Sequence, residues 1–201
     1  MSRRLSFKRS HVLDLLIVIG AAGAALDVVL GRDGPGATQS PVWFAATMSA
    51  LLVLVLLARH RFPFAAPATV WGLAAVISFV DGRLVGLPVP YLAGLASAAM
   101  LGNLSDTVKA RVGLAVVIVG AALVVHNGPN PGASEMVYVP LTFAVAWIAG
   151  FLLRVRSTQT EVAEQRAARA ERERAVAARL ALAEERTRIA RALHEVVAHA
   201  V

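Results

Sequence analysis

The sequence predicts an all-α protein, a polytopic membrane helix bundle of about six transmembrane helices followed by a long cytoplasmic coiled-coil helix. The chain of 201 residues is 57% hydrophobic, whereas soluble domains average roughly 45–50% apolar residues. Its mean hydropathy of +0.65 is correspondingly high. Apolar stretches alternate with short turns as far as position 153, and residues 154–201 then contain no Gly or Pro and are rich in Ala, Arg and Glu.

The cysteine content and the charge narrow the possible functions. The sequence has no cysteine, which excludes disulfides, thiolate catalysis and cysteine-ligated metals. The net charge is +7, and half of the 20 basic residues follow position 153. In a hydrophobic chain such a balance indicates cytoplasmic flanks of membrane spans rather than nucleic-acid binding. The C-terminal segment also mixes both charges and lacks aromatic residues, so no nucleic-acid partner is expected.

Each predicted span is an apolar stretch near the ~20 residues that a helix needs to cross a bilayer. In chain order the spans are Val12–Leu30, Pro41–Ala58, Pro63–Val80, Leu84–Gly102, Val112–Val125 and Val137–Leu153. The first is longer than the roughly 7–15-residue core of a signal peptide and is interpreted as an uncleaved anchor. Pro88 and Pro90 kink or delay the fourth helix. The third and fourth spans can alternatively form a re-entrant pair, and the fifth is short, after the polar link Ser105–Arg111.

The distribution of basic residues predicts the orientation. With the N-terminus inside, most basic residues outside the C-terminal segment flank the spans on the cytoplasmic side: Arg3, Arg4, Lys8, Arg9, Arg59, Arg61, Lys109, Arg111, Arg154 and Arg156. Only Arg32 and Arg83 then face outward. The positive-inside rule therefore predicts a multi-pass protein of the cell (plasma or inner) membrane with both termini in the cytoplasm.

Few side chains within the spans are candidates for a functional role. Asp14 and Asp27 are the intramembrane ionisable residues, and such acids are costly and often functional; both also lie near helix ends, where they can reach the interface. Small residues for close helix packing are Gly20, Gly23 and Ala24. Trp43 and Tyr138 are expected to be interfacial anchors. The outer loops are short, so any stimulus is expected to be read in the membrane or at its surface.

Residues from Arg154 onward are expected to form one helix of roughly 45 residues, too long for a lone globular helix. An interrupted apolar seam runs through it, formed by Leu152, Val155, Val162, Val176, Leu180 and Ile189. The seam favours a parallel dimeric coiled coil, with Glu–Arg pairs three or four residues apart in support. A solvated single helix or a helix lying on anionic lipid is the alternative.

The last stretch, 185–201, has the pattern of a helix that presents a histidine to solvent. At roughly 100° per residue, Ile189, Leu193, Val196 and Ala200 form one apolar stripe, and His194 lies on its flank. An imidazole that attacks the γ-phosphate of ATP must be reachable, and it benefits from an adjacent carboxylate that orients the ring or takes its proton.

That stretch resembles the phosphoacceptor box of bacterial two-component sensor histidine kinases, in the subfamily whose box reads roughly E-R-x-R-I-A-R-E-L-H-D-x-x-x-H. The matching residues are Glu185, Arg186, Arg188, Ile189, Ala190, Arg191, Leu193, His194, Glu195 and His199. The resemblance implies that His194 is the phosphorylated histidine, Glu195 the activating acid, and His199 the position linked to the reverse, phosphatase reaction. Ala192 replaces the usual glutamate. Glu195 is one methylene longer than the usual aspartate, which can misplace the base and lower autophosphorylation.

The resemblance also implies a domain plan and partners. A transmembrane sensor domain occupies 1–153, a signalling helix 154–183, and the start of a dimerisation and phosphotransfer domain 184–201. The sequence contains no Gly-rich nucleotide loop and no Asn-rich Mg²⁺ box. ATP and Mg²⁺ are therefore expected to act only through an ATP-binding kinase domain that this chain lacks, so the chain alone should be inactive. The expected partners are a second copy, that kinase domain, a response regulator and the lipid bilayer.

A function of another class remains open. The chain can instead be a small non-enzymatic membrane protein, either a transporter-like bundle or a dimeric membrane adaptor. That function predicts acidic side chains along a path between spans and no effect of replacing His194.

Overall fold

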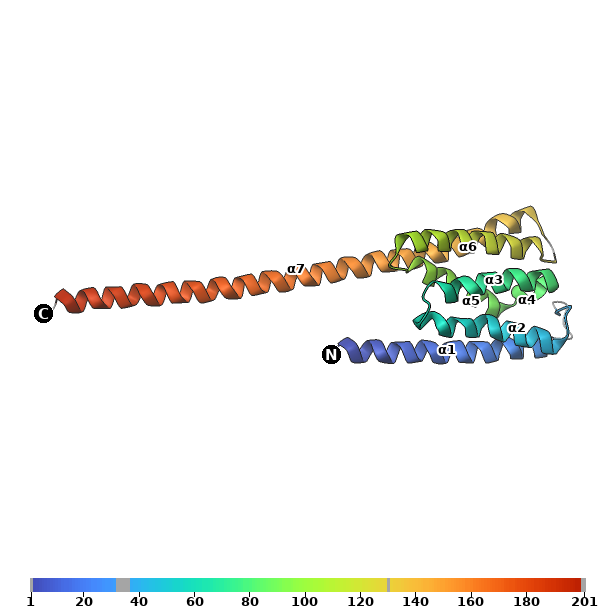
Figure 1. Ribbon diagram of the computed structural model, residues 1–201, viewed down its shortest axis with the longest axis horizontal. Helices are drawn as coiled ribbons and strands as arrows, with labels where there is room; N and C mark the ends of the chain where they lie inside the picture. The colour runs from blue at the N-terminus through green and yellow to red at the C-terminus, as the bar shows by residue number, and fades with distance from the viewer. Residues whose placement is uncertain (1, 32–36, 130, 200–201) are drawn as a thin grey trace. The chain divides into compact units, whose positions relative to one another are not determined.

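The computed structural model describes residues 2–31, 37–129 and 131–199, with side chains for 13–31, 37–129, 131–174, 176 and 177. Within these ranges the chain is all-α, as predicted, with seven α-helices and one 3-10 helix (Figure 1). The helices are α1 (Ser2–Leu30), α2 (Val42–Leu54), η2 (Val55–His60), α3 (Ala65–Val80), α4 (Gly82–Val85), α5 (Pro88–Gly102), α6 (Thr107–His126) and α7 (Ala133–His199). By its internal contacts the chain divides into two compact units, Met1–Arg154 and Val155–Val201.

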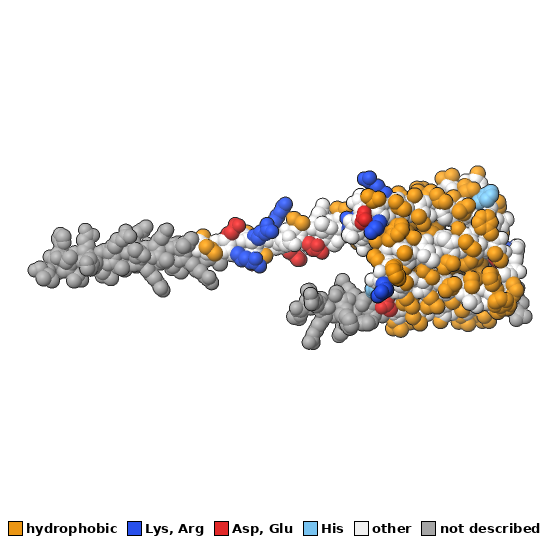
Figure 2. All heavy atoms as spheres, in the orientation of Figure 1, with side chains coloured by type: hydrophobic (Ala, Val, Ile, Leu, Met, Phe, Trp, Pro, Cys, Tyr) orange, Lys and Arg blue, Asp and Glu red, His pale blue; other side chains and the backbone are white. Residues whose placement is uncertain are grey.

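Four helical segments of the described chain are long and apolar enough to cross a membrane. They are Leu13–Leu30 of α1, Val42–His60 across α2 and η2, α6, and Ala133–Arg174 of α7, each containing an 18-residue stretch with a mean hydropathy of 2.0 to 2.2. Figure 2 shows apolar side chains over most of the visible face of the Met1–Arg154 unit. Since a water-soluble domain would not expose such a surface, these segments suggest a multi-pass membrane protein.

Two further apolar helices are shorter than the four spans. α3 has 16 residues and α5 has 15, so they measure about 22–24 Å against the ~30 Å of a hydrocarbon core. The predicted fourth span, Leu84–Gly102, is interrupted. Asp81 caps the single turn of α4 by accepting a hydrogen bond from the Arg83 N–H. Pro88 then opens α5 in its first turn, where proline has no hydrogen bond to lose.

The expectation of a short fifth span, Val112–Val125, was wrong. α6 has 20 residues and begins at Thr107, inside the segment expected to be a polar link. Asp106 is the reason, because its side chain accepts hydrogen bonds from the N–H groups of Val108 and Lys109 at the helix start. The backbone N–H of Lys109, with that of Val108 and the Lys109 charge, holds the pKa of Asp106 below its usual value.

Two apolar clusters hold the Met1–Arg154 unit together. One joins α1, α2, η2, α3, α4 and α5 around buried residues that include Ala24, Leu52 and Leu84. The other joins α3, α5, α6 and α7 around Trp71 and Phe143, whose rings meet edge to face with centroids 4.7 Å apart. Such aromatic pairs add about 0.5–1.5 kcal/mol beyond the burial of their area.

The helices of this unit run side by side (Figure 1). Hydrogen bonds and an ion pair between different segments of the chain occur at its two ends. The first, here called the Arg59 end, carries Asp14, which pairs with Arg59. The second, here called the Asp81 end, carries Ser40 and Asn127. Ser40 donates to Asp81, and Asn127 donates to Ser78.

The capping of α6 predicts a pH-dependent stability difference. Because the folded-state pKa of Asp106 is depressed, its stabilising effect is present at neutral pH and is lost as the pH falls through the folded pKa. We expect Asp106→Ala to lower the thermal midpoint of the detergent-solubilised chain at neutral pH, and the difference from wild type to narrow in acid. Asp106→Asn, which keeps an uncharged acceptor, should fall between the two at neutral pH. A difference that does not change with pH would contradict this role of the charge.

Candidate functional site

The predicted phosphoacceptor residues belong to α7. The backbone of residues 185–199 is helical, as the sequence predicts, and it continues the same helix that starts at Ala133. The side chains of His194, Glu195 and His199 lie outside the described residues, as do Ala200 and Val201. Helical geometry alone puts positions 195 and 199 about 40° apart and position 194 about 100° from position 195.

Within the bundle, α7 is held against α5 at two glycines. A Cβ atom at Gly102 of α5 would overlap the carbonyl oxygen of Trp147, and one at Gly150 of α7 would overlap the carbonyl oxygen of Ala99. Each glycine therefore lets the opposite backbone approach to a distance that no other residue permits. This contact between Ala99 and Gly102 of α5 and Trp147 and Gly150 of α7 is called the α5–α7 crossing below.

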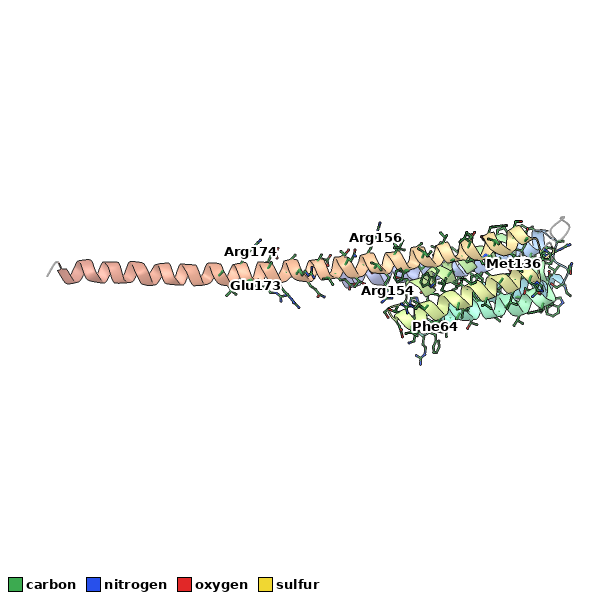
Figure 3. The ribbon with its side chains drawn as sticks, turned by 90° about the horizontal axis from the view of Figure 1, so that it is seen from above. Phe64, Met136, Arg154, Arg156, Glu173 and Arg174 are labelled. Carbon is green, nitrogen blue, oxygen red and sulfur yellow. The ribbon has the colours of Figure 1, made fainter. Side chains whose placement is uncertain are left out.

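Two side chains fasten α7 on either side of Gly150. The Trp147 indole N–H donates to the Ala110 carbonyl of α6 at 3.1 Å. Arg154 donates to the Ser105 carbonyl, in the turn between α5 and α6. Figure 3 shows Arg154 and Met136 on the α7 segment that runs along the bundle. The segment of α7 in this unit is thus tied to both α5 and α6 close to the unit's last residue.

Asp14, one of the two predicted intramembrane candidates, takes part in a small ionic cluster at the Arg59 end. Its Oδ1 lies 2.7 Å from an Arg59 guanidinium nitrogen and 3.1 Å from His60 Nε2. The Arg59 side chain is 11% exposed, and it also donates to the Leu56 carbonyl. The cluster joins the start of the α1 span to the end of η2. Removing either Asp14 or Arg59 would leave the other charge without its partner in a partly buried position, which is destabilising.

Asp81, at the other end, is an acid that sequence reasoning did not select. It is 1% exposed, and it accepts hydrogen bonds from the Ser40 N–H at 3.0 Å, the Ser40 hydroxyl at 2.7 Å and the Arg83 N–H at 3.1 Å. The Arg83 guanidinium donates to the Ala37 carbonyl at 3.1 Å. The Asp81 carboxylate therefore joins the segment before α2 to the turn after α3 at this end of the bundle.

The remaining sequence candidates have mixed outcomes. Ala24 is fully buried, as close packing requires. Gly20 makes only an ordinary contact with Val53, and a Cβ at Gly23 would meet nothing within 4 Å in the described part of the chain, so the expectation of close approach at these two was wrong. Trp43 and Tyr138 are exposed, and Asp27 lines a cavity.

The close-approach glycines had a signal in the sequence. Ala98 and Gly102 on α5, and Ala146 and Gly150 on α7, are pairs of small residues four apart, the spacing that lets membrane helices pack closely. The pairing of Asp14 with Arg59 had no such signal, because the two are separated by 45 residues. Among the described residues no group of three or more His, Cys, Asp or Glu side chains could hold a metal ion.

Comparison of the chain with protein-family models, with curated proteins and with solved structures gives no match.

The α5–α7 crossing predicts that replacing glycine by alanine destabilises the protein at the crossing but not at an open position of the bundle. Gly150→Ala should destabilise the chain by about 1–3 kcal/mol, because the new Cβ displaces the Ala99 carbonyl. Gly72→Ala is the matched control, since a Cβ there meets nothing within 4 Å among the described residues; it should stabilise α3 by roughly 0.5–1 kcal/mol. Thermal midpoints of both variants in the same detergent measure the contrast. Equal effects of the two substitutions would show that the crossing is not close.

Proposed function

We propose that this chain is the sensor, dimerisation and phosphoacceptor portion of a membrane histidine kinase. The observation that carries the proposal is the spacing of an acid and two histidines, His194, Glu195 and His199, behind the pattern 185–193. The structure supports it in one respect: the box lies on the same helix, α7, that forms the last long apolar segment. Packing changes among the membrane helices then have a direct helical route to the box.

The chemistry proposed for the box is phosphoryl transfer from ATP. A ring nitrogen of His194 attacks the γ-phosphorus, the bond to the bridging oxygen breaks, and ADP leaves. Glu195 orients the ring or takes its proton, a role worth typically about 10²–10⁴ in rate. An ATP-binding kinase domain supplies the nucleotide with Mg²⁺, and the phosphoryl group passes on to an aspartate of a response regulator.

The second unit supports the proposed dimer through its exposed apolar positions. Val162 and Val176 are 40% and 55% exposed, and the residues around them on α7 are mainly charged residues and alanines. Figure 3 shows two of these, Glu173 and Arg174, on α7. Apolar side chains that recur along a long charged helix are typical of a coiled-coil seam. We propose that a second copy buries this seam in a parallel pair.

We further propose that all six apolar helical segments of the Met1–Arg154 unit cross the membrane. They are α1, α2 with η2, α3, α5, α6 and the first part of α7. α3 and α5 are short, but the turn between them reaches the level at which α2 begins and α6 ends. Asp81 bonds to Ser40, just before α2, and Ser78 bonds to Asn127, just after α6. These contacts favour a full crossing over a re-entrant pair. The bundle then has a cytoplasmic Arg59 end and an outward Asp81 end, with both termini in the cytoplasm.

This topology predicts a labelling pattern that is simple to read, because the chain has no native cysteine. Single cysteines are introduced at three exposed positions, Gly86, Ser105 and Ser134. A membrane-impermeant maleimide should label Gly86→Cys and Ser134→Cys in intact cells, and Ser105→Cys only after permeabilisation. If Gly86→Cys is not labelled in either intact or permeabilised cells, the result would support the re-entrant pair. Labelling of Ser105→Cys in intact cells would show that the topology is the reverse of the one proposed.

Phosphotransfer itself is tested by supplying a separately purified ATP-binding domain from a kinase of the resembled subfamily to the full chain in vesicles. We expect label from γ-labelled ATP to appear on the chain as an acid-labile, alkali-stable adduct, because phosphohistidine is a phosphoramidate. His194→Ala should abolish the label and Glu195→Gln should reduce it by about 10²-fold or more. The chain without the added domain should remain unlabelled.

His199→Ala and His60→Ala are the matched histidine controls, and both should keep the label on His194. His199→Ala should in addition slow the loss of label, if that position serves the reverse reaction. Label that persists in His194→Ala would contradict the proposal and favour the non-enzymatic membrane protein instead.

A further inference from the structure

A small and largely enclosed cavity of about 50 Å³ lies among the helices of the Met1–Arg154 unit. Each of the α-helices α2 to α7 contributes at least one residue to its lining, among them Leu52 of α2, Val124 of α6 and Val139 of α7. The cavity therefore lies inside the bundle rather than in a groove along one of its faces.

The cavity is a gap between the two apolar clusters that hold this unit together. Leu52, Val70 and Ala74 on its lining belong to the cluster around Ala24, Leu52 and Leu84. Trp71 and Phe143, on the same lining, form the centre of the other cluster. Protein interiors contain few voids larger than a water molecule, so the two clusters meet here with less than the usual packing density.

Aromatic contacts hold one wall of the cavity in place. The ring centroid of Phe143 lies 4.7 Å from that of Trp71 and 5.0 Å from that of Tyr91. A Cβ atom at Gly94 of α5 would approach the Phe143 ring to 3.0 Å, so the ring also lies close to the α5 backbone. These contacts restrict the movements by which the Phe143 ring could close the gap.

The chemistry of the lining selects the kind of molecule that the cavity can hold. None of the described residues that line it is charged, and their side-chain hydrogen-bonding groups are the Trp71 indole N–H and the Tyr91 hydroxyl. A buried water typically makes about three hydrogen bonds, and apolar cavities remain dry and take apolar molecules instead. The lining therefore disfavours ions and water and favours an uncharged apolar occupant.

We propose that this cavity binds an apolar molecule of the size of a dissolved diatomic gas. An apolar protein cavity of about 150 Å³ can hold benzene or xenon. The present cavity, at about 50 Å³, is too small for benzene but suits a single xenon atom or a diatomic molecule. Such gases dissolve readily in hydrocarbon, so the lipid around the proposed spans supplies them. Binding here does not depend on phosphorylation of His194.

Xenon under pressure is the probe, applied to the full chain in detergent micelles with isotope-labelled leucine and valine methyl groups. Methyl NMR shifts of Leu52 and Val70, which line the cavity, should follow a saturation curve as the xenon pressure rises. The methyl groups of Val76, which is 65% exposed, should shift in proportion to pressure, because they report only xenon dissolved in the detergent. Benzene should give no saturable shift at Leu52 or Val70.

Val124→Met and Val139→Met each fill the cavity from a different helix, since methionine adapts to irregular gaps. Each should weaken saturable xenon binding at Leu52 and Val70 at least tenfold. Val76→Met, the same substitution at an exposed position, is the matched control and should bind xenon as wild type does. Thermal midpoints verify that each variant is folded.

The wild-type curve alone can overturn the proposal. Shifts of Leu52 and Val70 that stay proportional to xenon pressure would show that the cavity holds no xenon. Saturable binding of equal strength in wild type, Val124→Met and Val139→Met would place the xenon elsewhere. Saturable binding of benzene at the same methyl groups would contradict the size limit.

Discussion

The α5–α7 crossing is the contact that joins the last apolar helix to the rest of the bundle. Backbone atoms of the two helices meet at Gly102 and Gly150, where no side chain fits, and the Trp147 and Arg154 hydrogen bonds lie to either side of Gly150. Close-packed contacts of this kind have few alternative arrangements, so we expect a shift of α5 to move α7 with it. Because α7 continues as one helix to His199, the same movement can reach the proposed phosphoacceptor.

The two ends of the bundle use polar groups in different ways. At the Arg59 end, an ion pair between Asp14 and Arg59 joins the first two apolar segments. At the Asp81 end, a buried acid is satisfied by hydroxyl and amide donors. Asp27 departs from both patterns, because its buried oxygen has no partner in the described residues.

Much of the fold was predictable because hydrophobic length and turn composition are local properties. The all-α class and the four long apolar segments follow from them, as does the start of α5 at Pro88. The start of α6 was missed because charged residues after Asp106 suggested a link, whereas the Asp106 cap outweighs them. The partners of Asp14 and Asp81 depend on contacts between distant segments, which periodicity does not encode. The helical backbone of the box was predictable from its composition, whereas the roles of His194, Glu195 and His199 are carried by resemblance alone.

We propose that α7 transmits orientation from the bundle to His194. Insertions between Ala167 and Ala168 test it most directly, with His194 labelling by a supplied kinase domain as the readout in vesicles. Seven inserted residues return the helix to within about 20° of its original phase, whereas two rotate it by about 200°. We expect wild-type labelling for the seven-residue insertion and a strongly altered level for the two-residue insertion. Equal labelling of the two insertions and the wild type would contradict it.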